Sequence, residues 1–67
     1  MSVHILEALE KEKLFDAYSA RPPYQQNDYV GWITRAQREE TRQKRLDQML
    51  DELRRGDVYM KMKWNGK

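Results

Sequence analysis

The sequence predicts an all-α fold, a small bundle of three to four short helices followed by an extended C-terminal tail. Two runs carry apolar residues at positions i, i+3, i+4 and i+7, the spacing of one face of an α-helix. A pair of prolines precedes the first run, and an alternating apolar and polar pattern follows the second. A chain of 67 residues has room for one domain, so we expect a single helical domain over residues 1–67.

The segment before the prolines predicts two short helices, over about residues 3–10 and 12–20. Two apolar sets have helical spacing here, and the five-residue step from Leu9 to Leu14 turns them about 140° apart at 100° per residue. Two helices or a bend explain this rotation. Pro22 and Pro23 then end the second helix, because proline lacks a backbone donor and disfavours helix in the residue before it. The two sets are Ile5, Leu6 and Leu9, and Leu14, Phe15 and Tyr18.

The next two helices are predicted over residues 24–37 and 39–55. Their stripes lie about 90° apart on one straight helix, so we expect a break near Gln37 and Arg38. Gly56 closes the last helix as a C-cap. Trp32 is expected to be the main anchor of the core. The stripes are Tyr29, Trp32, Ile33 and Ala36, and Leu46, Met49, Leu50 and Leu53. The residues expected to form the structural core are Phe15, Tyr29, Trp32, Ile33, Leu46, Leu50 and Leu53.

The tail over residues 57–64 is predicted to be extended. Val58, Met60, Met62 and Trp64 alternate with other residues at a period of two, which is typical of a half-buried strand. The sequence shows no second strand that would pair with it. We therefore expect the tail to cross the helices, to bind a partner or a second copy through residues 58–64, or to remain frayed.

Composition argues against an enzyme and against a metal or cofactor site. The chain has no cysteine and one histidine, His4, around which no nucleophile arrangement is visible. Asp47, Asp51 and Glu52 lie off the apolar stripe and are expected to form a solvated face. No apolar run approaches the roughly 18 residues of a membrane helix, and no basic region opens the chain. We expect a cytoplasmic location without membrane insertion.

The basic segment, Arg35–Arg45, is the strongest local charge. It contains five cations and two acids, whereas the whole chain has a net charge of +2. Acidic residues are interspersed with the cations along the chain. Binding to phosphates needs a concentrated basic surface, so this pattern argues against nucleic acid as the main partner.

A helical wheel places Arg42 in the middle of the apolar stripe, with Arg38 and Arg45 toward its edge. In one interpretation Arg42 is structural: its stem packs on the core, its head meets a carboxylate or the carbonyls of a helix end, and Arg45 is more exposed. In the other interpretation Arg38, Thr41, Arg42 and Arg45 form a site that binds an anion or a partner near a helix N-terminus.

Residues 14–56 resemble the bacteriocin-protection, YdeI/OmpD-associated family. The resemblance rests on an aromatic-x-x-Trp-Ile pattern, a following Glu-Thr-Arg-x-x-Arg-Leu pattern, spaced leucines and a glycine. It implies a compact helical domain, usually without an assigned molecular activity. The matching residues are Phe15, Pro22, Pro23, Tyr29, Trp32, Ile33, Ala36, Glu40, Thr41, Arg42, Arg45, Leu46, Leu50, Leu53 and Gly56.

The sequence therefore predicts a small non-enzymatic domain with a role in protein interaction or stress tolerance and an unknown protein partner. The alternative is weak binding of nucleic acid or an anion through the basic segment and the Lys61, Lys63 and Trp64 tail, where aromatic rings beside lysines allow base stacking.

Overall fold

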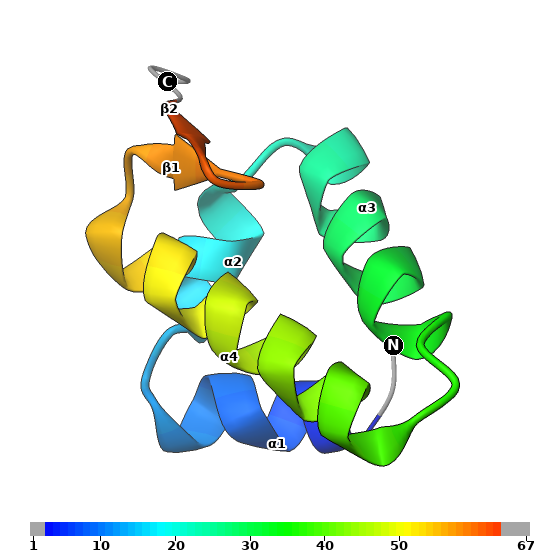
Figure 1. The fold of residues 1–67 in the computed structure, drawn as a ribbon. Coiled ribbons are helices and arrows are strands. Elements are labelled where there is room, and N and C mark those ends of the chain that lie inside the picture. The colour runs from blue at the N-terminus through cyan, green and yellow to red at the C-terminus, as the bar shows by residue number, and fades with distance from the viewer. Residues whose placement is uncertain (1–2, 64–67) are drawn as a thin grey trace.

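The computed structural model describes residues 3–63, and these form four helices and one small hairpin (Figure 1). The predicted all-α class is confirmed, and α4 has the bounds that the sequence predicts. The second helix begins three residues later than predicted, and the third ends three residues earlier. The elements are α1 (Val3–Lys11), α2 (Phe15–Ala20), α3 (Pro23–Thr34), α4 (Glu39–Arg55), β1 (Val58–Tyr59) and β2 (Met62–Lys63).

The turn between α1 and α2 explains why α2 begins late. Lys13 adopts a left-handed conformation with φ of 58°, the usual backbone state just beyond a helix end. The Leu14 amide donates to the Leu9 carbonyl at 2.8 Å, and the Lys13 amide donates to the Glu10 carbonyl at 3.1 Å. These two bonds form a Schellman motif, with Leu9 and Leu14 both buried beside it. Helix therefore cannot continue through Lys13.

The prolines separate α2 from α3 as expected. Pro22 is extended, with ψ of 149°, and Pro23 is the first residue of α3, where a missing N–H costs nothing. At the other end of α3, residues 35–38 form the turn to α4, and Arg38 is extended at the N-cap of α4. Glu39 and Glu40 occupy the first turn of α4, where the helix dipole favours acidic side chains.

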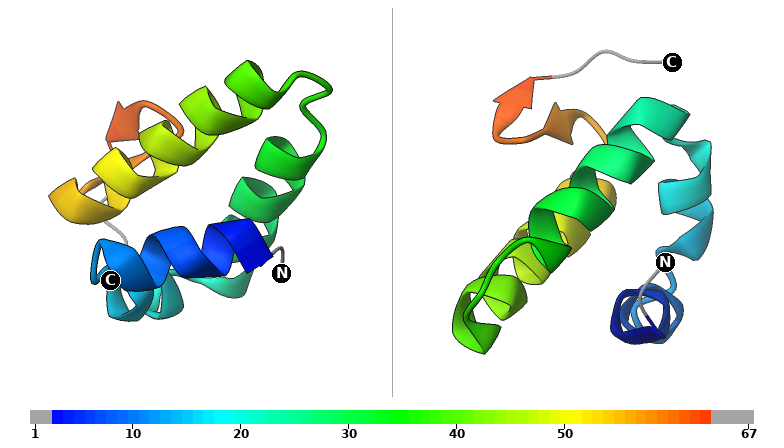
Figure 2. Two further views of the ribbon diagram at one scale, coloured as in Figure 1. Left: turned by 90° about the horizontal axis from the view of Figure 1, so that it is seen from below. Right: turned by 90° about the vertical axis from the view of Figure 1, so that its right-hand side faces the viewer.

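The helices α3 and α4 form an antiparallel pair, and α1 lies across one side of it (Figures 1 and 2). The short α2 connects α1 to the start of α3. The hairpin lies beside the C-terminal end of α4 and the link between α2 and α3. The turn between α3 and α4 lies at the opposite end of the molecule.

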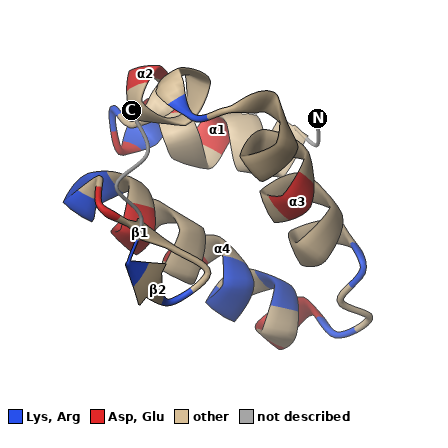
Figure 3. Ribbon diagram, turned by 90° about the horizontal axis from the view of Figure 1, so that it is seen from above, with Lys and Arg blue, Asp and Glu red and all other residues tan. Residues whose placement is uncertain are grey.

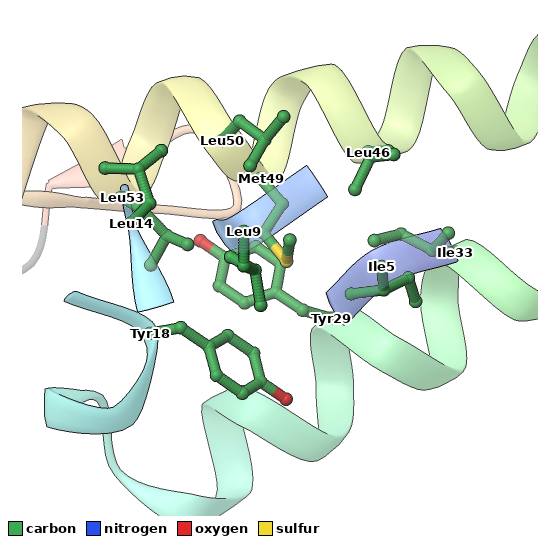
Figure 4. Packing of buried hydrophobic residues seen from close by; sticks show 10 residues of the cluster. All are labelled: Ile5, Leu9, Leu14, Tyr18, Tyr29, Ile33, Leu46, Met49, Leu50 and Leu53. Carbon is green, nitrogen blue, oxygen red and sulfur yellow. The ribbon is translucent and has the colours of Figure 1, made fainter. Parts of the chain in front are cut away.

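The core lies between these helices, with the ring of Tyr29 near its centre (Figure 4). Tyr29 and Met49 are fully buried. Five of the seven residues expected in the core are buried there, namely Tyr29, Ile33, Leu46, Leu50 and Leu53. The other members of the core cluster are Ile5, Leu9, Leu14, Tyr18 and Met49.

Two core predictions are wrong. Phe15 is 42% exposed, because α2 begins at Phe15 and directs Tyr18 inward, while Leu14 reaches the core from the preceding turn. Trp32 is partly buried and packs at the edge of the cluster, so Tyr29 takes the central place expected for Trp32. Both residues lie one position from a buried one, an error of helix phase that spacing alone leaves open.

The prediction that the tail has no strand to pair with is also wrong. Within the described residues, β1 pairs antiparallel with β2 through Val58 with Lys63 and Tyr59 with Met62. The turn residues Met60 and Lys61 interrupt the alternation that the sequence showed. Trp64, which completes the predicted pattern, lies outside the described residues.

Candidate functional site

The arginines Arg42 and Arg45 connect α4 to the end of α3. The Arg42 Nη1 donates to the Ala36 carbonyl at 3.2 Å, just beyond α3. The Arg45 Nη1 donates to the Trp32 carbonyl at 2.5 Å, and its guanidinium lies 5.3 Å from the centre of the Trp32 ring. Cations near a helix C-terminus interact favourably with the free carbonyls and the dipole. Part of the basic segment therefore holds the turn between α3 and α4.

The relative exposure of these arginines is the reverse of the prediction. Arg42 is exposed, whereas Arg45 is half-buried because its guanidinium stacks on Trp32. The contact of Arg42 with a carbonyl after α3 agrees with the structural interpretation of this residue.

The four residues expected to bind an anion or a partner lie along the first turns of α4, but their guanidinium groups have separate contacts. Arg38 lies 3.8 Å from the Glu40 carboxylate, while Arg42 and Arg45 contact the two backbone carbonyls. Thr41 is half-buried in the first turn of α4. Figure 3 shows basic segments at the turn and at the start of α4 with an acidic segment between them.

A groove of about 530 Å³ opens between α1, the end of α3 and the start of α4. We call it the elbow groove. Its volume is in the range of sites that bind small molecules or peptide side chains. Apolar side chains from all three helices contribute to it, and Arg42 is the one lining residue that was predicted as a site residue. The lining residues are His4, Ile5, Ala8, Ile33, Thr34, Glu39, Arg42, Gln43 and Leu46.

A second site of interest is a buried polar cluster at the opposite end, formed by Arg21, Gln25 and Glu52. These side chains are 4%, 0% and 2% exposed. The Arg21 Nη1 donates to the Gln25 Oε1 at 3.0 Å, and the Arg21 Nη2 donates to the Glu52 carbonyl at 3.1 Å. The prediction that Glu52 belongs to a solvated face is wrong, because the hairpin folds back over this side of α4.

The Glu52 carboxylate accepts four hydrogen bonds. The Tyr29 hydroxyl donates to Oε1 at 2.5 Å, and the Gln48 Nε2 donates to Oε2 at 3.0 Å. The backbone amides of Met60 and Lys61 donate to Oε1 and Oε2 at 2.8 Å and 2.9 Å. A buried carboxylate needs this degree of pairing, because an unsatisfied charge away from water is costly. Glu52 thereby joins α3, α4 and the hairpin.

Three tyrosines lie beside this cluster. The Tyr59 ring packs edge-on against Tyr24 and Tyr29, with ring centres 6.1 Å and 5.5 Å apart, and the Tyr59 hydroxyl donates to the Asp28 carboxylate. Burial, and then the hydrogen bond to Glu52, raise the pKa of Tyr29 above its ordinary value. Burial, and then the hydrogen bond to Asp28, raise the pKa of Tyr59 in the same way.

Sequence reasoning did not find the polar cluster. Arg21 precedes two prolines, Gln25 lies in the first turn of α3, and Glu52 lies off the apolar stripe. None of these positions signals burial locally. One partial signal was available: two acids, Asp51 and Glu52, lie between the stripe leucines Leu50 and Leu53, close enough to the core for one of them to be covered by a later segment of the chain.

The described part of the chain has no group of three or more acidic, histidine or cysteine residues able to hold a metal ion. It also has no helix long and apolar enough to cross a membrane.

The fold and these sites define a small helical domain with an amphipathic groove at one end and a buried polar cluster under a hairpin at the other. A family model described as "Bacteriocin-protection, YdeI or OmpD-Associated" matches residues 3–56. The chain belongs to this family, in agreement with the resemblance found in the sequence. Comparison with curated proteins and with solved structures found no match.

Proposed function

We propose that the chain is a non-enzymatic protein-interaction domain and that its elbow groove binds a segment of a partner protein. The observation that carries this proposal is the composition of the groove, which combines an apolar floor of Ile5, Ile33 and Leu46 with the guanidinium of Arg42. Peptide grooves commonly pair apolar pockets for side chains with a few polar groups that fix orientation.

The charge around the groove favours an acidic partner. The basic segment supplies five cations at this end of the molecule against Glu39 and Glu40, and of these charged residues Arg42 and Glu39 line the groove itself. A partner segment with an aliphatic side chain next to a carboxylate would place the first on the floor and the second near Arg42. Arg42 is exposed and makes one long hydrogen bond, so its head can reorient without uncovering the core.

The test is a selection of peptides from a random array by the full-length protein, followed by affinity measurement for the selected peptides. We expect enrichment of peptides with a carboxylate beside an aliphatic residue. Arg42→Glu should lower their affinity at least about tenfold, since it reverses the charge that meets the carboxylate. Lys44→Glu is the matched control, because Lys44 is exposed on the same helix and does not line the groove.

No enrichment, or equal losses in the two variants, would refute the groove as the binding site. Equal losses would point instead to a general effect of net charge.

The alternative is weak binding of nucleic acid or an anion through the basic segment and the lysines of the tail. Glu39 and Glu40 at the start of α4 oppose it, because they repel an anion from the helix N-terminus. A dissociation constant below about 1 μM for any defined DNA or RNA at physiological salt would favour this alternative, since non-specific binding is typically about 10⁻⁴–10⁻⁶ M.

A role in stress tolerance, as the family description suggests, is part of this proposal. The cytoplasmic location and self-association through residues 58–64 remain predictions, and sedimentation over a range of concentrations tests the latter.

A further inference from the structure

We propose that the polar cluster is a recognition site for the backbone of a protein turn, and that the hairpin occupies it as a displaceable internal ligand. The partner segment is a turn of another protein in which a tyrosine precedes two residues with free backbone N–H groups. The site lies at the opposite end of the molecule from the elbow groove, so this inference does not depend on the function proposed above.

The contacts with the hairpin are mainly contacts with its backbone. The Arg21 Nη2 donates to the Val58 carbonyl at 2.9 Å. The two oxygens of Glu52 accept from the consecutive amides of Met60 and Lys61. None of these three bonds uses a side chain of the hairpin. Any segment that presents a carbonyl and, two residues later, two successive amides in this geometry satisfies the same groups.

Tyr59 supplies the side-chain selectivity of the site. Its ring lies against Tyr24 and Tyr29, and its hydroxyl donates to the Asp28 carboxylate. A phenylalanine at this position would fill the same place but leave Asp28 without this donor. The occupant is therefore best described as a tyrosine-containing turn.

The backbone conformation and the exposure of the hairpin favour its release from the site. Met60 and Lys61 have φ values of 50° and 63°, a left-handed conformation that two-residue hairpin turns normally assign to asparagine and glycine. Methionine and lysine are strained there. Both residues of β2 are exposed, Met62 to 63%, so β1 and the turn make most of the contact with the helices.

The position of the family match supports a distinction between site and occupant. The match spans residues 3–56 and includes Arg21, Asp28, Tyr29 and Glu52, whereas the hairpin begins at Val58. The groups that recognise the turn belong to the helical domain that defines the family. The segment that fills the site lies beyond the matched residues.

The decisive experiment uses the full-length variant Met60→Pro. Proline removes the amide of residue 60 and cannot adopt a positive φ, so the hairpin should leave the site while the chain keeps its length. The probe is a synthetic peptide of residues 57–63, DVYMKMK, added to ¹⁵N-labelled protein up to about 5 mM, since a tethered segment has an effective concentration in the millimolar range.

We expect the amide signals around Tyr29 and Glu52 to shift on addition of the peptide, with at least about tenfold tighter binding to Met60→Pro than to the wild-type chain. The same peptide methylated on the backbone nitrogens of Met60 and Lys61 should not bind. Met62→Ser is the matched control: it changes an exposed hairpin residue and should bind the peptide as weakly as the wild type.

Absence of peptide binding to a folded Met60→Pro variant would overturn the proposal, and so would equal binding of the methylated peptide. A wild-type dimer that forms with rising concentration and disappears in Met60→Pro would show that the site takes the hairpin of a second copy. That result would overturn the choice of a partner's turn as the occupant.

Hydrogen exchange of the wild-type chain tests the same inference without a variant. If Met60→Pro loses its helical circular dichroism and is therefore unfolded, hydrogen exchange becomes the deciding experiment. The Met60 and Lys61 amides should be protected, because Glu52 accepts them, yet exchange at least about tenfold faster than the amides of Met49 and Leu50 through local opening. Exchange as slow as that of these core amides would mean that the hairpin leaves only on global unfolding, and would overturn the proposal. Unprotected amides would overturn it too, because Glu52 would then not hold them.

Discussion

Glu52 connects three parts of the fold, because its carboxylate accepts donors from α3, α4 and the hairpin. Glu52→Ala removes the acceptor of all of them and leaves polar groups buried beside Arg21. We expect a loss of at least about 3 kcal/mol in the free energy of unfolding, since hydrogen bonds to charged groups each contribute about 1.5–3 kcal/mol. Urea denaturation followed by circular dichroism measures it.

Asp51→Ala is the control for Glu52. Asp51 is adjacent on α4, and its ion pair with Arg55 at 3.1 Å is exposed to solvent. Exposed pairs of this kind contribute about 0.5 kcal/mol or less. Equal losses in the two variants would mean that Glu52 is solvated in solution and that the hairpin does not rest on it.

The importance of Glu52 could not be predicted from its neighbours in the sequence. Its partners Arg21 and Tyr29 lie 31 and 23 residues away, and the amides of the turn lie beyond the end of α4. A helical wheel gives the direction of a side chain from its own helix. It does not show whether a later segment will fold over that direction, so it placed Glu52 in solvent.

Arg45 and Arg42 should differ in their effect on stability, in the opposite order to the one the wheel suggests. Arg45→Ala removes a charged hydrogen bond to the Trp32 carbonyl and a cation–π contact, together worth about 2–3 kcal/mol. Arg42→Ala removes one longer bond from an exposed side chain, so we expect a loss below about 1 kcal/mol. Thermal melts of both variants compare them directly. A larger loss for Arg42 would restore the prediction that Arg42 is the structural arginine.

At the scale of the elements, two glycines, one at a helix end and one inside a helix, give a matched test. Gly56 ends α4 with φ of 82°, and a Cβ there would meet no atom within 4 Å, so Gly56→Ala isolates the cost of the left-handed backbone. We expect a loss of about 1–2 kcal/mol. Gly31 lies inside α3, where alanine favours the helix by about 1 kcal/mol.

The outcome at Gly31 depends on Arg35. A Cβ at Gly31 would lie 2.7 Å from the Arg35 Nη2, the far end of an exposed and flexible side chain that can move away. Gly31→Ala should therefore be neutral or stabilising in the same thermal melts. A loss at Gly31 equal to that at Gly56 would mean that the Arg35 contact is important for the packing of α3.

A substitution in the hairpin turn should have the opposite effect and raise the stability of the fold. Replacing Met60 with Asn and Lys61 with Gly supplies residues that adopt positive φ readily, and it keeps both amides that donate to Glu52. We expect a gain of about 1–2 kcal/mol in the free energy of unfolding, measured by urea denaturation. No gain would indicate that Met60, which packs at the edge of the core, contributes as much as the strain costs.

The elements could be predicted where a stripe and a cap coincide, as in α4 with its leucines and Gly56. They could not be predicted where long-range contacts decide. The turn at Met60 and Lys61 has no asparagine or glycine, so the sequence indicated one extended tail rather than a hairpin. The late start of α2 follows from a lysine in a left-handed conformation, a state for which lysine has little preference.

At the scale of the whole molecule, stability rests on a core that includes polar groups. In the described residues every buried side-chain nitrogen or oxygen atom has a hydrogen-bond partner. A domain of this size buries only about 60% of the surface of its unfolded chain, so its stability is marginal and the loss of a buried polar contact is a large change for it. The apolar part of this core could be read from helical spacing. The polar part depends on how α3, α4 and the hairpin pack together. The spacing of residues along the chain does not predict that packing.

The two tyrosines at the polar cluster make the whole fold sensitive to alkaline pH. The pKa values of Tyr29 and Tyr59 are raised in the folded chain, so the folded state holds their protons more tightly than the unfolded state. Their contribution to stability is fully present below the unfolded pKa of about 10 and is lost as pH rises from there through the higher folded values. We expect the melting temperature to fall above about pH 10.

Phenylalanine variants test whether this fall in melting temperature comes from the two tyrosines. Tyr29→Phe and Tyr59→Phe together should flatten the dependence of melting temperature on pH, because neither ring then carries a proton to lose. Tyr24→Phe is the control, since Tyr24 lies in the same cluster of tyrosines but is 57% exposed. If the melting temperatures of the double variant and the control decline equally above pH 10, the alkaline loss does not come from Tyr29 and Tyr59, and their hydroxyls at Glu52 and Asp28 do not couple the hairpin to the fold.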